Sequence, residues 1–421
     1  MAARSSFGCI VVGGGPSGLA AAAALACKGI DVAMAAAIDR NGAPSAETRT
    51  AALFPSAIAM LQRLGAWDEL APHCAPLKAI RIVDATGRLL RAPEVLFKAS
   101  DIGLGDLGFN VPNAALARSL GAAARALGVT MLADAEVLAT HEDGSHRCVE
   151  LSGGRSIRAP LVVAADGRGS MVRAAAGIAT SGWTYDQAAL ATRFSHSRPH
   201  SGISTELHGA QGPCTTVPLA DGVSSLVWMD RPDAIEALAS APAEDFLRHL
   251  GQRLDGLLGT LSDAGARRVF PLTGLMATVM GRARVALVGE AGHAMPPIGA
   301  QGLNLAFSDV AVLADLVAEQ AGRGGDTGSA GILAQYDRAR SADVRRRVTA
   351  VDLLNRSVRP SLWPLGLARG AGLHVLAAVP SLRQRLMREG LFPPPPVPML
   401  MARFAEAGAA GGVATARHPA A

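Results

Sequence analysis

The residues whose types and spacing could do chemistry begin with a glycine-rich run near the start of the chain. Gly13, Gly15 and Gly18 occupy the three glycine positions of the pattern GxGxxG. In that pattern the first glycine permits a tight turn, the second lets the backbone approach a pyrophosphate, and the third lets a helix pack close to a strand. Pro16 and Ser17 open the helix, whose free N–H groups suit an anion. The run therefore predicts a dinucleotide-binding turn; the alternative is a glycine-rich turn without a ligand.

The elements around this turn are predicted to form a strand–helix–strand unit. Phe7–Val12 and Asp31–Ala35 are short apolar runs typical of buried strands, and Pro16–Lys28 is an alanine-rich helical segment. Such units usually end the second strand with Asp or Glu, which binds the adenosine ribose. That place falls at Ala36, and Asp39 is a nearby carboxylate that could substitute. Loss of one such hydrogen bond would weaken dinucleotide binding by roughly 1 to 3 kcal/mol without abolishing it.

Two later motifs follow apolar runs that are predicted to be parallel strands of the same sheet. Asp166-Gly167 follows Leu161–Ala165, and Gly289-Glu290 follows Val285–Val288. A long helix is predicted from Asn304, so the backbone N–H groups of the segment before it could face a negatively charged ring. The candidate binding residues of this segment are Pro297, Gly299, Ala300, Gln301, Gly302, Leu303 and Asn304.

In order and spacing, these three motifs resemble those of the p-hydroxybenzoate-hydroxylase-like FAD-dependent monooxygenases. Shorter stretches, such as Leu61–Trp67, are similar to the family's ubiquinone-biosynthesis (polyprenylphenol) hydroxylases. The resemblance covers residues 7–392 and implies FAD as the cofactor. It implies that NAD(P)H binds transiently, since only one dinucleotide-binding unit is visible. It also implies that Arg49 lies near the FAD pyrophosphate, that Glu290 binds the ribityl chain, and that Asp166 helps to orient the nicotinamide nucleotide.

Three residues depart from the family pattern. Glu290 stands where Asp is usual, Ala300 stands where Gly is commoner before Gln, and Asn113 stands where many relatives carry Arg or Gln. These departures affect fine geometry rather than the choice of cofactor. No catalytic side chain is assigned, because the flavin carries most of the reactivity. No metal site is expected, and His293 is interpreted as a residue that holds its loop by hydrogen bonds.

The expected fold is α/β, with a Rossmann-like FAD-binding domain, an interleaved antiparallel substrate sheet and a C-terminal helical segment. Short β-like runs such as Ile203–His208 and Ser224–Met229 predict the second sheet. The predicted FAD-binding domain has three pieces, residues 1–75, 110–180 and 275–358. The predicted substrate domain takes residues 76–109 and 181–274, the helical segment takes 359–407, and a disordered tail takes 408–421.

Composition excludes several classes of protein. Of the 421 residues, 49% are hydrophobic and 18% charged, which excludes intrinsic disorder for the bulk of the chain. A net charge of +5 with 4% aromatic residues argues against nucleic acid as a partner. Five cysteines without CxxC spacing predict neither a disulfide framework nor a zinc site and favour a cytoplasmic location. No transmembrane helix is predicted.

The function that the resemblance implies is NAD(P)H- and O₂-dependent hydroxylation of a polyprenylated aromatic molecule in ubiquinone biosynthesis. The alternatives are a monooxygenase of a soluble aromatic compound, a reductase of prenyl chains, and a non-catalytic scaffold of a quinone-biosynthesis complex. Pro360–Phe392 is apolar with several arginines. It favours either a peripheral contact with the inner membrane or an ordinary amphipathic helix packed on the FAD domain.

Overall fold

The computed structural model describes the chain except for residues 1–4, 37–48, 87–91, 133–134, 358–362 and 403–421, and the side chains of residues 363–367. Asp39, the carboxylate expected near the ribose, lies outside the described residues. The tail predicted over residues 408–421 also lies outside them.

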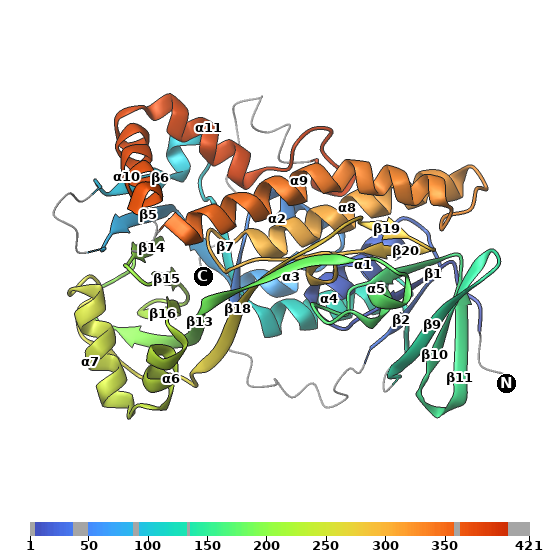
Figure 1. Cartoon of the computed structure of the whole chain (residues 1–421), viewed down its shortest axis with the longest axis horizontal. Coiled ribbons are helices and arrows are strands. Elements are labelled where there is room, and N and C mark those ends of the chain that lie inside the picture. Colours follow the sequence, from blue (N-terminus) through green and yellow to red (C-terminus); the bar gives the residue numbers. More distant parts are fainter. Residues whose placement is uncertain (1–4, 37–48, 87–91, 133–134, 358–362, 403–421) are drawn as a thin grey trace, which may run out of the picture.

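A six-stranded sheet carries the three motifs at the ends of its strands (Figure 1). Its central strands β20, β12, β1 and β2 all run parallel, as predicted. Because parallel strands end at the same edge of a sheet, the turns that follow them gather there. In sheet order, the strands are β19 (Gly281–Arg282), β20 (Val285–Leu287), β12 (Leu161–Ala164), β1 (Cys9–Val12), β2 (Val32–Ala35) and β8 (Thr130–Leu132).

Helices cover this sheet, and the alanine-rich α1 (Pro16–Cys27) lies between α4 (Asn113–Ala126) and α8 (Gln301–Gly322). Residues 18–25 of α1 are all buried, and the small side chains of the alanines among them allow neighbouring helices to approach closely. Among the described residues, α8 alone is long and apolar enough to cross a membrane, but 56% of that window is buried inside the protein. Its contacts with α1 and with α9 (Ala330–Ser357) are those of a core helix.

A second, nine-stranded sheet lies beside the first (Figure 1). Most of its neighbouring strands are antiparallel, as predicted, but β5 and β14 pair in parallel. The purely antiparallel expectation is wrong there because a long connection through the first sheet separates the two strands, which permits a parallel crossover. In sheet order, the strands are β21 (His293–Ala294), β18 (Arg268–Ala277), β13 (Thr180–His196), β16 (Val223–Asp230), β15 (Pro213–Pro218), β14 (Ile203–His208), β5 (Ala79–Asp84) and β6 (Val95–Lys98), with β17 (Leu261–Ser262) on β13.

Smaller elements complete the fold. A separate three-stranded sheet contains β3 (Thr50–Leu53), β7 (Gly108–Pro112) and β4 (Ala75–Leu77). A second three-stranded sheet contains β9 (Val137–Asp143), β10 (His146–Leu151) and β11 (Arg155–Ala159). The remaining helices are α2 (Pro55–Arg63), α3 (Trp67–Leu70), α5 (Met171–Ala175), α6 (Pro232–Ser240), α7 (Ala243–Leu254), α10 (Trp363–Ala378) and α11 (Pro380–Leu391).

Candidate active site

The glycine-rich turn lies between β1 and α1, and its three positions require glycine for different structural reasons. Gly13 has a φ of 120°, and a Cβ there would lie 2.2 Å from the carbonyl oxygen of Ala165. A Cβ on Gly18 would lie 2.0 Å from the carbonyl oxygen of Gly13. By contrast, a Cβ on Gly15 would meet no atom within 4 Å, and Gly15 lines a cavity. The protein's own backbone therefore requires two of the glycines, whereas the third leaves room for a ligand.

That cavity, here called the first cavity, has a volume of about 290 Å³ and brings residues of all three motifs together. The predicted residues that line it are Gly15, Pro16, Ser17, Arg49, Gly167, Gly289, Glu290, Gly302 and Leu303. The other predicted residues, which do not line it, are Gly13, Gly18, Asp166, Pro297, Gly299, Ala300, Gln301 and Asn304.

Two of the residues outside the lining shape the turns that face the first cavity. The Asp166 carboxylate accepts hydrogen bonds from the Ser170 hydroxyl at 2.5 Å and from the backbone N of Val172 at 3.3 Å, at the start of α5. The Asn304 amide nitrogen donates to the carbonyl oxygen of Ala52 at 2.8 Å, which ties α8 to β3. The expected contact of Asp166 with a nicotinamide nucleotide stays a prediction.

The helix α8 begins three residues before the predicted start, so Gln301 to Asn304 form its first turn. Ala300 precedes the helix in the left-handed conformation, with a φ of 54°. That conformation costs a residue with a Cβ roughly 1 to 2 kcal/mol, which explains why glycine is commoner at this place. The first N–H groups of a helix lack partners within it and carry partial positive charge. Gly302 and Leu303 bring this end of α8 to the first cavity, which fits an anionic part of a ligand.

Glu290 lines the first cavity and forms an ion pair with Arg168, with 3.1 Å between Oε2 and Nε. Their side chains are 57% and 39% exposed, so solvent screening keeps the stabilising energy of the pair small. Arg168 also donates to the Thr273 hydroxyl of β18 at 3.0 Å. The pair therefore joins the third motif to the second sheet while the Glu290 carboxylate remains at the cavity wall.

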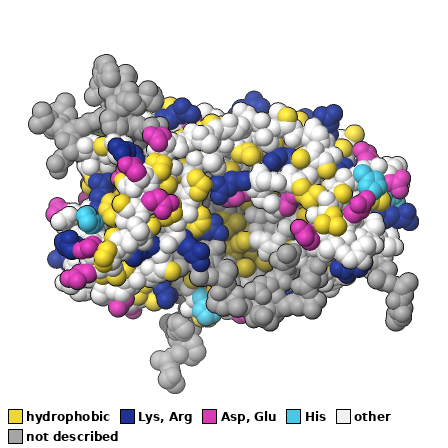
Figure 2. All heavy atoms as spheres, turned by 60° about the horizontal axis from the view of Figure 1, so that its bottom comes forward, with side chains coloured by type: hydrophobic (Ala, Val, Ile, Leu, Met, Phe, Trp, Pro, Cys, Tyr) yellow, Lys and Arg dark blue, Asp and Glu magenta, His cyan; other side chains and the backbone are white. Residues whose placement is uncertain are grey.

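A second cavity of about 170 Å³ adjoins the first. The two share Arg49, Asn113, Glu290, Ala294 and Met295 in their linings. Figure 2 shows a hollow on one face of the protein in which hydrophobic side chains are visible, with Lys and Arg side chains beside it. Two adjoining spaces suit a reaction between a bound cofactor and a separate molecule.

Three strands of the second sheet form most of the second cavity's wall. Ala189 and Ala191 of β13 line it, whereas Leu190, between them, packs in a separate core with Phe246 of α7. This alternation follows from the two-residue period of a strand. Phe270 of β18 also lines the cavity and lies 4.9 Å, by its ring centroid, from the Arg49 guanidinium carbon. Sequence reasoning missed these residues; strand alternation is the signal that could have found them.

Polar groups occupy one side of the second cavity. The hydroxyls of Thr50 and Ser225 lie 3.0 Å apart, and the Asn110 amide nitrogen donates to Ser225 at 3.3 Å. Asn113, one of the family departures, has a buried Oδ1 with no hydrogen-bond partner among the described residues. A small set of polar groups in an apolar wall can orient a ring that carries a hydroxyl group.

His293 is held as the sequence indicates. It is 2% exposed, and its Nε2 donates to an Asp309 carboxylate oxygen at 2.7 Å. The structural interpretation of His293 is therefore confirmed, although the residue also lines the first cavity. Among the residues that the structure describes, no three His, Cys, Asp or Glu side chains gather as a metal site.

Known proteins resemble the chain over most of its length. The family described as FAD binding domain matches residues 7–351. Ubiquinone hydroxylase UbiL of Rhodospirillum rubrum is 34% identical, over 91% of this chain and 89% of its own length. The 3-demethoxyubiquinol 3-hydroxylase of Escherichia coli is 29% identical, over 90% of this chain and 97% of its own length.

A solved structure supports the same fold. The p-nitrophenol 4-monooxygenase PnpA of Pseudomonas putida superimposes with a TM-score of 0.73 at 21% identity. The match covers 92% of this chain and 99% of that one. The family match and the similarity to ubiquinone hydroxylase UbiL agree with the three motifs at the sheet edge. The chain belongs to the FAD binding domain family and, within it, to the FAD-dependent monooxygenases.

Proposed function

We propose that the chain hydroxylates the aromatic ring of a polyprenylated phenol, a precursor of ubiquinone, with NAD(P)H and O₂. The observation that carries the proposal is the pair of adjoining cavities that share five residues. The relatives named as ubiquinone and demethoxyubiquinol hydroxylases support the substrate class. The division into a cofactor-binding part and a substrate-binding part, with the predicted boundaries, belongs to the same proposal.

The first cavity is proposed to hold FAD. Gly15 and the start of α1 would face the pyrophosphate, with Arg49 nearby, and Glu290 would accept hydrogen bonds from the ribityl hydroxyls. Gly302 and Leu303, at the start of α8, would face the negative charge of the reduced ring. The fit rests on the space beside Gly15 and on the uncapped helix ends. When bound, FAD accepts hydride from NAD(P)H and activates O₂.

The second cavity is proposed to hold the phenol ring. Ala189, Ala191 and Phe270 offer apolar walls that exclude water from the reacting ring. The hydroxyls of Thr50 and Ser225 lie within the lining and could orient the ring's own hydroxyl. The protein's contribution is then binding, orientation and exclusion of water rather than a catalytic side chain.

The helices α10 and α11 are proposed to contact the membrane that holds the prenylated substrate. Exposed apolar side chains and arginines together suit the surface of an anionic bilayer. The charged groups here include Arg385, whose side chain is 79% exposed. Among the described side chains, the large apolar residues exposed on these helices and between them are Val375, Val379, Leu382 and Leu386.

Vesicle sedimentation tests the membrane contact. Wild-type protein is expected to sediment with phosphatidylglycerol vesicles, and the Leu382→Ser and Leu386→Ser double variant is expected to remain in the supernatant. Leu353→Ser changes an exposed leucine of α9 and serves as the matched control. Equal sedimentation of the double variant and wild type would contradict the contact.

Quinone analysis in cells that lack the gene tests the proposed substrate. Mass spectrometry is expected to show a polyprenylated precursor one oxygen atom short of a normal intermediate, and the wild-type gene should remove it. Normal quinone content under aerobic growth would contradict the proposal. In that case, binding of FAD together with hydroxylation of a soluble phenol would favour the soluble-aromatic alternative.

A further inference from the structure

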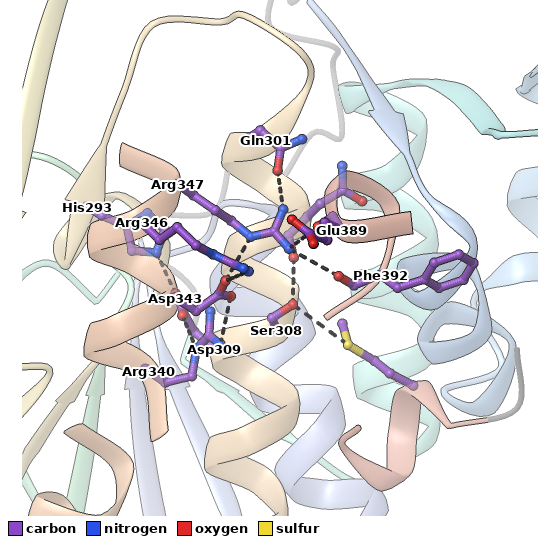
Figure 3. Close-up of polar contacts among 12 residues, drawn as sticks. His293, Gln301, Ser308, Asp309, Arg340, Asp343, Arg346, Arg347, Glu389 and Phe392 are labelled. Carbon is purple, nitrogen blue, oxygen red and sulfur yellow. Dashed lines mark hydrogen bonds and ion pairs between the residues drawn. The ribbon is translucent and has the colours of Figure 1, made fainter. Parts of the chain in front are cut away.

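A network of buried charged side chains, here called the charge network, lies behind the loop that follows β20 (Figure 3). Asp309 of α8 accepts hydrogen bonds from His293 at 2.7 Å, from the backbone N of Gly289 at 3.1 Å and from Arg340 of α9 at 2.8 Å. The side chains of His293, Asp309 and Arg340 are at most 2% exposed. Because Gly289 and His293 line the first cavity, one end of the charge network fixes a wall of that cavity.

The charge network continues along α9 and reaches the start of α8. Arg340 donates to Asp343 at 3.2 Å, and Arg347 donates to the other oxygen of Asp343 at 3.1 Å. Arg347 also donates to the side-chain oxygen of Gln301, as Figure 3 shows. Gln301 is the first residue of α8 and stands directly before Gly302, which lines the first cavity. The two turns that face this cavity are thus joined from behind.

Arg347 binds a third element, the C-terminal end of α11. Its guanidinium donates to the carbonyl oxygens of Glu389 at 3.3 Å, Gly390 at 3.2 Å and Phe392 at 3.2 Å. Carbonyls at the end of a helix have no partner inside it, so this cation satisfies them and complements the negative end of the helix. The Arg347 side chain is only 12% exposed. One side chain therefore links α11 to the turn that opens α8.

The neighbouring cations hold the pKa of two carboxylates of the charge network, Asp309 and Asp343, below the ordinary value. Burial alone would raise the pKa of Asp309, but His293 and Arg340 outweigh burial and hold that pKa below its ordinary value. Burial would likewise raise the pKa of Asp343, but Arg347 and Arg340 hold it below the ordinary value. Removing Arg347 would take one partner from a buried carboxylate and release Gln301.

We infer that Arg347 is a positioning residue for FAD: it fixes Gln301 and makes α11 part of the cofactor site. Arg347 does not line the first cavity, and α11 lies outside residues 7–351 that the family matches. The inference rests on the proposed place of FAD in the first cavity. It adds that a helix remote in sequence controls how firmly the cofactor-facing turn is held.

Arg346 provides a matched control, because it donates to the same Asp343 oxygen at 3.0 Å but, among the described residues, forms no hydrogen bond or ion pair with Gln301 or α11. We expect Arg347→Gln to raise the dissociation constant of FAD about 10-fold and to lower the midpoint potential of bound FAD. The potential should fall because the reduced ring is negatively charged and the protein loses a positive charge behind the start of α8, which is proposed to face that ring. Arg346→Gln should change the dissociation constant less than 2-fold, and Arg347→Lys should restore most of the potential.

A double-mutant cycle keeps the inference testable if Arg347→Gln folds poorly. Arg347→Lys keeps the charge, and with it the potential, but loses most of the guanidinium hydrogen bonds, so it should weaken FAD binding. Gln301→Ala removes only the acceptor and should reproduce most of that loss of affinity. The two effects should not multiply in the double variant of Arg347→Lys and Gln301→Ala. Equal affinities and potentials in Arg347→Gln and Arg346→Gln would overturn the inference, as would independent effects in the cycle. Gly15→Ala, measured alongside, tests the cofactor's place separately: retained FAD affinity in that variant would overturn the placement itself.

Discussion

The first cavity is walled by turns and helix starts, whereas the second is walled largely by residues of three strands, β13, β16 and β18. In the glycine-rich turn beside the first cavity, a Cβ added at Gly13 or Gly18 would lie about 2 Å from a backbone oxygen. In the second, Ala189 and Ala191 face the space while Leu190, between them, packs in another core. The proposed cofactor side therefore depends on backbone geometry, and the proposed substrate side depends on the sizes of individual side chains.

This difference indicates which substitutions the wall of each cavity tolerates. A backbone-built wall fails when a Cβ enters a close contact, whichever side chain carries it. A side-chain wall keeps its fold through many substitutions while the space inside it changes. The variants below separate the two kinds of wall, from the largest expected effect to the smallest.

Gly18→Ala should have the largest effect. Its Cβ would lie 2.0 Å from the Gly13 carbonyl oxygen, so α1 must move away from β1, and we expect a loss of about 3 kcal/mol or more in the free energy of unfolding. Gly15→Ala, the matched variant, should keep the apoprotein within about 0.5 kcal/mol of wild type. Thermal unfolding of both apoproteins measures this difference.

The same pair should differ in cofactor binding. Folded Gly15→Ala is expected to bind FAD at least 10-fold more weakly, about 1.4 kcal/mol, because its Cβ would enter the first cavity. Equal thermal stability of the two variants, or unchanged FAD affinity in Gly15→Ala, would break the distinction between glycines required by the backbone and the glycine that leaves room for a ligand.

Asp343→Asn should have the next largest effect, on stability and its pH dependence. The pKa of Asp343 lies below its ordinary value, so below about pH 4 the unfolded chain binds a proton that the native protein resists. Stability from this group is present above that pH and is lost as the pH falls further. The variant should lose about 3 kcal/mol at pH 7 and show a shallower decline on acidification. If thermal unfolding of the variant showed the same loss of stability on acidification as wild type, this role of Asp343 would be contradicted.

Ala191→Leu should affect only the substrate side. The larger side chain would occupy part of the second cavity, so the KM for the phenol should rise about 10-fold, or about 1.4 kcal/mol. FAD affinity should stay within about 2-fold of wild type. Leu190→Met, on the opposite face of β13, is the control and should leave KM unchanged. Steady-state kinetics and FAD titration decide, and a parallel loss of FAD affinity in Ala191→Leu would contradict the separation.

Ala300→Gly should have the smallest effect. The residue stands at a φ of 54°, where glycine relieves local strain but costs more conformational entropy on folding. The net gain should be about 0.5 kcal/mol in the free energy of unfolding, measured by urea denaturation. A clear loss of stability would show that the Ala300 methyl group contributes more through packing than its conformation costs.

The sequence indicated the turns that line the first cavity because their geometry is local. Gly13, Gly15 and Gly18 lie within six residues, and the turns behind β12 and β20 follow apolar runs directly. The start of α8 was predicted at Asn304 rather than Gln301, because Ala300 in a left-handed conformation is invisible without coordinates. A parallel pairing of β5 with β14 was missed for the same reason: pairing depends on distant chain segments.

The wall of the second cavity and the charge network could not be predicted because their partners are far apart in sequence. Arg347 meets Gln301 and Phe392 only in the folded protein. One usable signal did exist: Arg340, Asp343 and Arg347 are spaced by three and four residues, which places them on one face of a helix. Their alternating charges predict mutual contacts but not the elements that they join.

The most direct test of the proposed function is an in vitro reaction under ¹⁸O₂. Purified protein loaded with FAD would be mixed with NADH or NADPH and a short-chain prenylated phenol, and the product mass would be measured. The proposed function predicts a hydroxylated ring that carries one ¹⁸O atom, formed in step with nucleotide oxidation. Oxidation of the nucleotide that yields only hydrogen peroxide and leaves the phenol unchanged would contradict it.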